Sequence, residues 1–165
     1  MYNYEVRQSQ IVKVPKLISM EAVMIAVIEQ TYDYKKRMEY QPDTQTFVES
    51  ESDCLHYVRG FQFPYGWIKE SGTPPEPHWD VYIMSDQHFK LGDEIPVKII
   101  GVFERNDGDY KFVAVEEQRN INELDQLSME ETKALHLLYP RIKPGEGWFG
   151  RSRAMELYMT SEKAL

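Results

Sequence analysis

Residues 94–115 read Glu-Ile-Pro-Val-Lys-Ile-Ile-Gly-Val-Phe-Glu-Arg-Asn-Asp-Gly-Asp-Tyr-Lys-Phe-Val-Ala-Val. The apolar runs Glu94–Phe103 and Lys111–Val115 are typical of two buried strands. Between them, Asn106–Asp109 carries Asn-Asp-Gly-Asp, which is a strong turn signal. The stretch therefore predicts a β-hairpin whose core positions are Val97, Ile99, Phe112 and Ala114.

Further strands are expected on the N-terminal side of this hairpin. Residues 24–29 have a composition that also suits a helix, but their Val and Ile residues favour a strand. Pro42 and Asp43 mark a turn between two more strands. Residues 71–77 contain three prolines and are therefore expected to form a loop. The remaining expected strands are Lys36–Tyr40, Thr46–Glu49, Asp80–Met84 and a strand or hairpin at Tyr4–Val14.

The C-terminal third of the chain changes to helical patterns. Ser128 and Glu131 have the spacing of a capping box, which predicts a helix over Met129–Tyr139 that ends before Pro140. Residues 143–148 are expected to form a loop, and Arg151–Lys163 a second helix. Strands followed by helices indicate an α+β fold, namely a small antiparallel β-barrel flanked by two C-terminal helices.

Composition narrows the class of protein. The 165 residues carry 19 basic and 27 acidic side chains, a net charge of −8, which opposes binding to nucleic acids and to anionic membranes. No apolar run approaches the length of a membrane span, and the N-terminus lacks a signal-peptide pattern, so the cytoplasm is the expected compartment. A single cysteine, Cys54, excludes an intramolecular disulfide and is expected to be a small buried residue. No linker or repeat divides residues 1–165, so one domain is expected.

Candidate chemistry comes from charged side chains near strand ends. The four histidines lack metal-ligand spacing and are expected at the surface or at sheet edges. Glu104, Asp107 and Asp109 form an oxygen-rich cluster that suits Mg²⁺, although a solvated turn explains them more simply. Residues 35–37, Lys-Lys-Arg, suit phosphate binding, and a solvated strand edge is again the simpler explanation.

Six segments, in order, resemble the soluble inorganic pyrophosphatases, a family with a small β-barrel flanked by helices. Phe63–Ile68 resembles the family's Asn-Tyr-Gly-aromatic-Ile segment, and Asp109–Val115 resembles its Asp-x-Lys-apolar-apolar-Ala-Val segment. The other similar segments are Tyr34–Arg37, His78–Val81, Pro96–Val102, and Leu137–Tyr139 together with Gly147–Trp148. The resemblance covers residues 25–155 and implies the pyrophosphatase fold.

The resemblance also implies a set of site residues. Mg²⁺ would be bound by Asp80, Glu104 and Asp109. Substrate phosphates would be bound by Lys36, Lys111 and Arg141, and the catalytic set would comprise Tyr65, Asp80, Lys111 and Tyr139. Two aspartates of the family's metal motif fall on Pro75 and Pro77, and its substrate arginine has no counterpart near Asp53. Because phosphoryl transfer depends on metal ions and positive charge, weak activity is expected.

Three functions follow as hypotheses. The first is Mg²⁺-dependent hydrolysis of pyrophosphate or another phosphoanhydride by a divergent family member. The second is a metal-independent barrel enzyme that acts on another small molecule, and the third is a noncatalytic protein that binds a protein partner. A phosphate-containing small-molecule substrate is the expected ligand of the first. The family forms dimers or hexamers, so a homo-oligomer is a further expectation.

Overall fold

The computed structural model describes residues 22–160. The strand or hairpin expected at Tyr4–Val14 and the last residues of the second predicted helix lie outside this range. Within it, no helix is long and apolar enough to cross a membrane.

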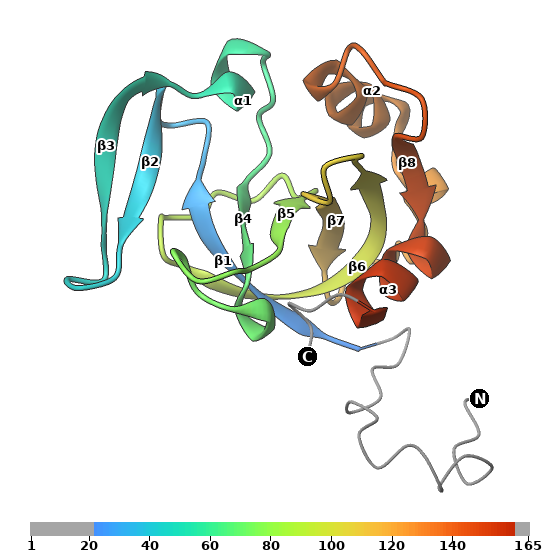
Figure 1. The fold of residues 1–165 in the computed structure, drawn as a ribbon, viewed down its shortest axis with the longest axis horizontal. Coiled ribbons are helices and arrows are strands. Elements are labelled where there is room, and N and C mark those ends of the chain that lie inside the picture. The colour runs from blue at the N-terminus through green and yellow to red at the C-terminus, as the bar shows by residue number, and fades with distance from the viewer. Residues whose placement is uncertain (1–21, 161–165) are drawn as a thin grey trace, which may run out of the picture.

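Five strands close into a β-barrel, as predicted (Figure 1). They follow the order β1-β4-β5-β7-β6, and β6 pairs back onto β1 to complete the ring, while β8 extends the sheet beyond β6. The bounds of these six strands are β1 Met24–Gln30, β4 Tyr65–Ile68, β5 Asp80–Ile83, β6 Glu94–Glu104, β7 Lys111–Glu116 and β8 Gly147–Gly150. The strand interpretation of residues 24–29 is therefore confirmed.

One neighbouring pair of strands departs from the antiparallel pattern. β5 and β7 run parallel, with Asp80 opposite Lys111, so the barrel is mixed rather than wholly antiparallel. The predicted hairpin occupies β6 and β7, which are antiparallel. β5 lies on the other side of β7. This parallel pair brings Asp80 and Lys111 together.

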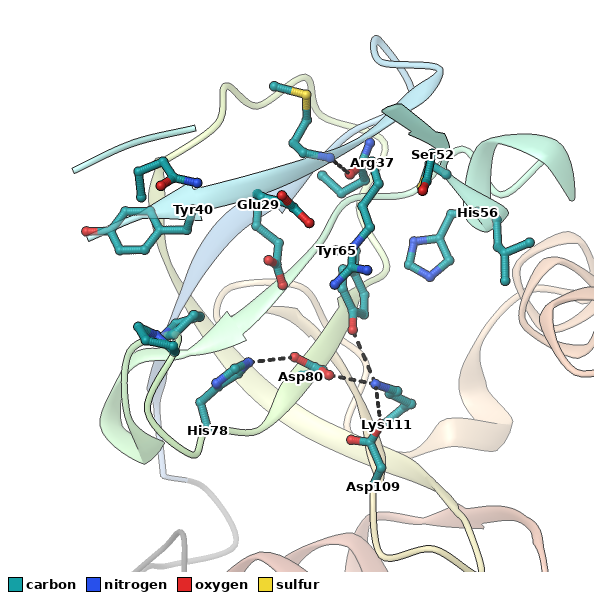
Figure 2. A pocket seen from close by; sticks show the side chains of 18 of the residues that line it. Glu29, Arg37, Tyr40, Ser52, His56, Tyr65, His78, Asp80, Asp109 and Lys111 are labelled. Atoms are coloured by element: carbon teal, nitrogen blue, oxygen red, sulfur yellow. Dashed lines mark hydrogen bonds and ion pairs between the residues drawn. The ribbon is translucent and has the colours of Figure 1, made fainter. Parts of the chain in front are cut away.

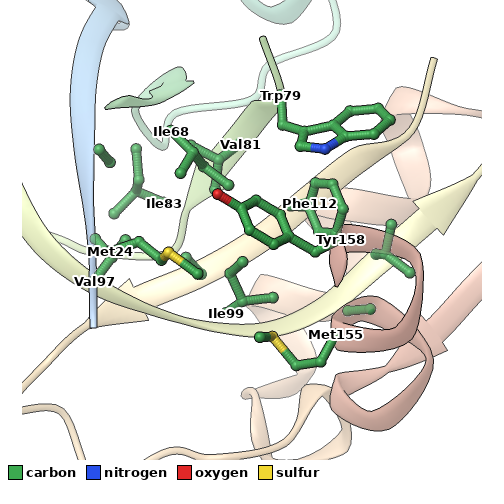
Figure 3. Close-up of a cluster of buried hydrophobic side chains, with 14 of the residues drawn as sticks. Met24, Ile68, Trp79, Val81, Ile83, Val97, Ile99, Phe112, Met155 and Tyr158 are labelled. Atoms are coloured by element: carbon green, nitrogen blue, oxygen red, sulfur yellow. The ribbon is translucent and has the colours of Figure 1, made fainter. Parts of the chain in front are cut away.

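Alternation along the strands divides the core into two clusters. In β7, Phe112 and Ala114 belong to a cluster that includes α3, and Val113 and Val115 belong to a cluster that includes α2. Figure 3 shows Tyr158 of α3 reaching Phe112, with ring centroids 5.7 Å apart. The four core positions expected in the hairpin are all buried. Burying a large apolar side chain contributes about 1.5–3 kcal/mol, so both clusters are major sources of stability.

Two helices pack on the barrel where the sequence places them. α2 spans Met129–Leu138 and α3 spans Arg151–Thr160. The Ser128 hydroxyl accepts from the Glu131 backbone amide at 3.1 Å, and the Glu131 carboxylate accepts from the Ser128 amide at 3.0 Å. The predicted capping box is therefore confirmed. Shorter elements not predicted are α1 (Leu55–Val58) and the 3-10 turns η2 (Lys69–Ser71) and η3 (Leu124–Gln126).

The loop expected at residues 143–148 is partly a strand. Gly147 and Trp148 begin β8, which pairs with the end of β6. Gly101 permits this approach, because a Cβ there would lie 2.8 Å from the Phe149 carbonyl oxygen and 2.9 Å from the Leu124 side chain.

A separate hairpin projects beside the barrel (Figure 1). β2 (Lys36–Gln41) and β3 (Thr46–Asp53) form a two-stranded sheet around the predicted Pro42–Asp43 turn. The residues between β4 and β5 form the predicted proline loop. This hairpin, α1 and the proline loop surround the ends of strands β1, β4, β5 and β7.

Candidate active site

A cavity of about 1030 Å³ lies between the β2–β3 hairpin, α1, the proline loop and the barrel (Figure 2). Its acidic lining residues are Glu29, Glu39, Asp53, Glu76, Asp80 and Asp109, and its basic ones are Arg37 and Lys111. The other lining residues include Ser52, Cys54, Tyr40, Tyr65 and the prolines 74, 75 and 77, together with the histidines His56 and His78. Polar groups that converge in a large concave site make this cavity the candidate active site.

Lys111 forms the centre of a buried network at the base of the cavity. Its Nζ lies 2.6 Å from Asp80 Oδ2, 3.2 Å from Asp109 Oδ2 and 3.4 Å from the Tyr65 hydroxyl. The second oxygen of Asp80, Oδ1, lies 3.2 Å from His78 Nε2. The structure thus brings together four residues predicted for the site, Tyr65, Asp80, Asp109 and Lys111.

Charge pairing sets the protonation of this network. Burial would raise the pKa of Asp80, but hydrogen bonds from His78 and Lys111 hold that pKa well below its usual value. Burial likewise opposes the charge of Lys111, yet Asp80 raises the pKa of that ammonium. The hydrogen bond to Asp80 raises the pKa of His78. Asp80 and Lys111 are therefore a charged pair at neutral pH.

Glu29 is a cavity residue that the sequence reasoning did not single out. It stands on β1, and within the described chain its carboxyl has no hydrogen bond or ion pair. Burial, reinforced by the nearby charge of Asp80, raises the pKa of Glu29 to about 7. A carboxyl with such a pKa can both accept and release a proton at neutral pH. The signal in the sequence was an acid at the end of an otherwise apolar strand.

Arg37, not its neighbour Lys36, lines the cavity. Lys36 pairs with Asp53 at 2.9 Å and donates to the Glu51 carbonyl oxygen. Figure 2 shows Arg37 extending from β2 toward Tyr65, and its guanidinium has no ion pair within residues 22–160. Adjacent residues of a strand point to opposite faces, so the basic run places Arg37 in the cavity lining and Lys36 outside it.

His56 also lines the cavity, from α1. Its ring packs against Tyr65, with centroids 4.5 Å apart, and against Tyr82 at 5.4 Å. Burial, and then the charge of Lys111, lowers the pKa of His56 to about 4, so the imidazole is neutral at neutral pH. Helix α1 has only four residues and no side-chain cap, so the sequence pattern did not predict the helix that places His56 in the cavity.

Besides Lys36, three predicted site residues lie outside the cavity lining. Tyr139 stacks on Phe103, with centroids 4.1 Å apart, and its hydroxyl lies 2.7 Å from that of Tyr82. Glu104 accepts two hydrogen bonds from Arg153, at 3.0 and 2.7 Å. Arg141 is exposed.

The side chains present do not fit Mg²⁺. That ion takes six oxygen ligands in near-octahedral geometry, usually from one or two carboxylates, substrate phosphates and waters. Within the part of the chain that the structure describes, no group of three or more His, Cys, Asp or Glu side chains is placed to hold a metal. Of the three acids predicted as ligands, Glu104 is held by Arg153, and Asp80 and Asp109 converge on the Lys111 ammonium. Lys111 thus supplies the positive charge between those two carboxylates.

Comparison with known proteins supports the resemblance drawn from the six segments. The family model for inorganic pyrophosphatase matches residues 26–163. The chain belongs to the inorganic pyrophosphatase family. A search of curated proteins finds no match.

Solved structures of inorganic pyrophosphatases share the fold. The enzyme from Neisseria gonorrhoeae superposes with a TM-score of 0.66 at 18% identity, over 90% of this chain and 92% of that one. The Ehrlichia chaffeensis protein gives 0.64 at 18% identity, over 88% and 96% of the two chains. The Helicobacter pylori enzyme gives 0.63 at 17% identity, over 91% and 98%.

Proposed function

We propose that this member of the inorganic pyrophosphatase family is a small-molecule enzyme that works without bound Mg²⁺. The observation that carries the proposal is the position of Lys111, whose ammonium pairs with both Asp80 and Asp109. This internal cation offsets one of the two negative charges and lies between the carboxylates, where a divalent ion would otherwise bind. The substrate carries a phosphate group, which binds to Arg37.

The lining is acidic as a whole, and Arg37 is the positive charge in it that supports an anionic ligand. Asp80 and Asp109 are paired with Lys111, and Asp53 is paired with Lys36. Glu29 is partly protonated at neutral pH because its pKa is raised to about 7. Arg37 remains a guanidinium without an ion pair among residues 22–160, and its planar fork suits phosphate oxygens.

Glu29 and the Asp80–Lys111 pair supply the chemistry. Glu29 acts as the general acid–base, since a catalytic group is most effective when its pKa lies near the working pH. Lys111 stabilises negative charge that develops on the substrate, and Asp80 fixes the position of the ammonium at 2.6 Å. The reaction class is therefore proton transfer at a group next to the bound phosphate.

Mg²⁺-dependent hydrolysis of pyrophosphate is the second candidate. It is favoured by membership of the family and by the surplus of acids in the cavity lining, six against the two basic residues. In this alternative, phosphate binding to the protein would depend on added Mg²⁺.

Calorimetric titration separates the two candidates. Inorganic phosphate and pyrophosphate are titrated into the protein with EDTA and, separately, with millimolar Mg²⁺. The proposal predicts binding in EDTA that Arg37→Ala weakens about 10- to 100-fold, the value of a charge-assisted hydrogen bond. The control Lys35→Ala removes an exposed charge outside the cavity lining and should bind like the wild type. Binding only with Mg²⁺ would establish the second candidate, and unchanged binding by Arg37→Ala would refute the proposal.

A further inference from the structure

The cavity is much larger than a phosphate or pyrophosphate ion requires. Its volume of about 1030 Å³ lies at the upper end of the range of roughly 300–1,000 Å³ found for pockets that bind drug-sized organic ligands. The charged network of Asp80, Lys111 and Asp109 occupies the barrel end. The part of the cavity next to β3 and α1 is lined by other side chains than this charged network. It is not needed to hold a phosphate.

Uncharged hydrogen-bonding groups line that space. Figure 2 places His56 and Ser52 near each other, on the side of Tyr65 away from His78. The Ser52 hydroxyl has no hydrogen bond to another described residue. Among the lining residues 52–56 the single acid is Asp53, which is paired with Lys36. A neutral imidazole and a hydroxyl suit hydroxyl or carbonyl oxygens better than they suit phosphate.

The environment of His56 fixes the direction of its hydrogen bond. Nδ1 is buried and has no partner, while Nε2 also lacks a partner within the described chain but is not enclosed. A neutral imidazole has one N–H, and a buried N–H without an acceptor is rarer in proteins than an unsatisfied acceptor. The tautomer with its proton on Nε2 avoids a buried N–H without an acceptor and leaves Nε2 able to donate to an oxygen in the cavity.

We propose that His56 and Ser52 form a subsite for the organic part of the substrate. The substrate is then a phosphate ester of an oxygen-rich organic molecule, of the sugar phosphate class, rather than inorganic pyrophosphate. Nε2–H of His56 donates to a hydroxyl or carbonyl oxygen while Arg37 holds the phosphate. This inference rests on the proposed function, because Arg37 must bind the phosphate.

Binding of matched probes tests the subsite. Glycerol 3-phosphate, ribose 5-phosphate and glucose 6-phosphate are titrated in EDTA beside inorganic phosphate and pentyl phosphate. At least one oxygen-rich ester should bind about tenfold more tightly than both reference compounds, as expected for one or two neutral hydrogen bonds. His56→Phe keeps the aromatic packing and should abolish that preference without changing the affinity for inorganic phosphate. His56→Gln restores a donor near the position of Nε2 and should recover part of it.

Controls separate failure of the subsite from failure of the proposed function. His88→Gln alters an exposed histidine outside the cavity and should bind every probe like the wild type. Thermal melting of each variant shows that it is folded. The subsite is refuted if no ester binds more tightly than inorganic phosphate, or if folded His56→Phe retains the preference. Absence of binding of any phosphate compound in EDTA would instead refute the proposed function.

Discussion

Lys111 and Asp80 form a charged pair at the base of this cavity. An ammonium 2.6 Å from one carboxylate and 3.2 Å from a second acts as a fixed cation. Both partners are largely buried, with side chains 11% and 15% exposed, so their attraction is only weakly screened by solvent. A fixed cation of this kind stabilises developing negative charge without any metal-binding step.

Single residues of the site were predictable to different degrees. Tyr65, Asp80, Asp109 and Lys111 follow from resemblance to the family's motifs, and the structure groups them around Lys111. The basic run 35–37 was predicted, but Lys36 was assigned to the site in place of Arg37, because the alternation of a short strand cannot be assigned without knowing which face meets the barrel. His56 was missed because its position depends on packing against distant aromatic rings rather than on local pattern.

Glu29→Gln should change the pH dependence of stability. The folded-state pKa of Glu29 is about 7 against an ordinary 4.5, so the unfolded chain releases this proton first as pH rises. Stability is therefore lost between about pH 4.5 and 7, by at most about 1.4 kcal/mol per pH unit for one group. Urea unfolding at pH 5 and pH 8 should show the variant losing less stability with rising pH than the wild type. An equal loss in both proteins would show that Glu29 ionises normally.

At the scale of elements, helix α2 depends on local signals that the sequence displays. Its capping box is formed, and Glu131 also accepts two hydrogen bonds from Arg119, at 2.6 and 2.9 Å. Strand β8 and helix α1 gave no comparable signal. β8 has only four residues, two of them glycine, and it is stabilised by pairing with β6 rather than by its own propensity.

Ser128→Ala should destabilise the protein by about 1 kcal/mol, because the Glu131 amide loses its capping oxygen. Ser152→Ala is the matched control, since Ser152 is exposed in the first turn of α3. It should change stability by less than about 0.5 kcal/mol. Urea denaturation of the two variants beside the wild type measures both values. Equal stability of the two variants would mean that the capping box contributes nothing.

At the scale of the whole molecule, the order of elements was enough to predict a barrel with external helices. The order could not reveal that β5 and β7 are parallel, because that pairing joins segments separated by the whole of β6. The same pairing sets Asp80 opposite Lys111 at the base of the cavity. The β5–β7 pairing therefore brings the two residues of the site together, and it could not be predicted from any single segment.

A phosphate-release assay on pyrophosphate shows whether this family member needs Mg²⁺. Protein at high concentration is incubated with pyrophosphate, once with millimolar Mg²⁺ and once with EDTA. With the Lys111 ammonium between Asp80 and Asp109, we expect that Mg²⁺ does not raise turnover to ordinary enzymatic rates. Turnover of about 1–10³ per second that requires Mg²⁺ and is abolished by EDTA would contradict it.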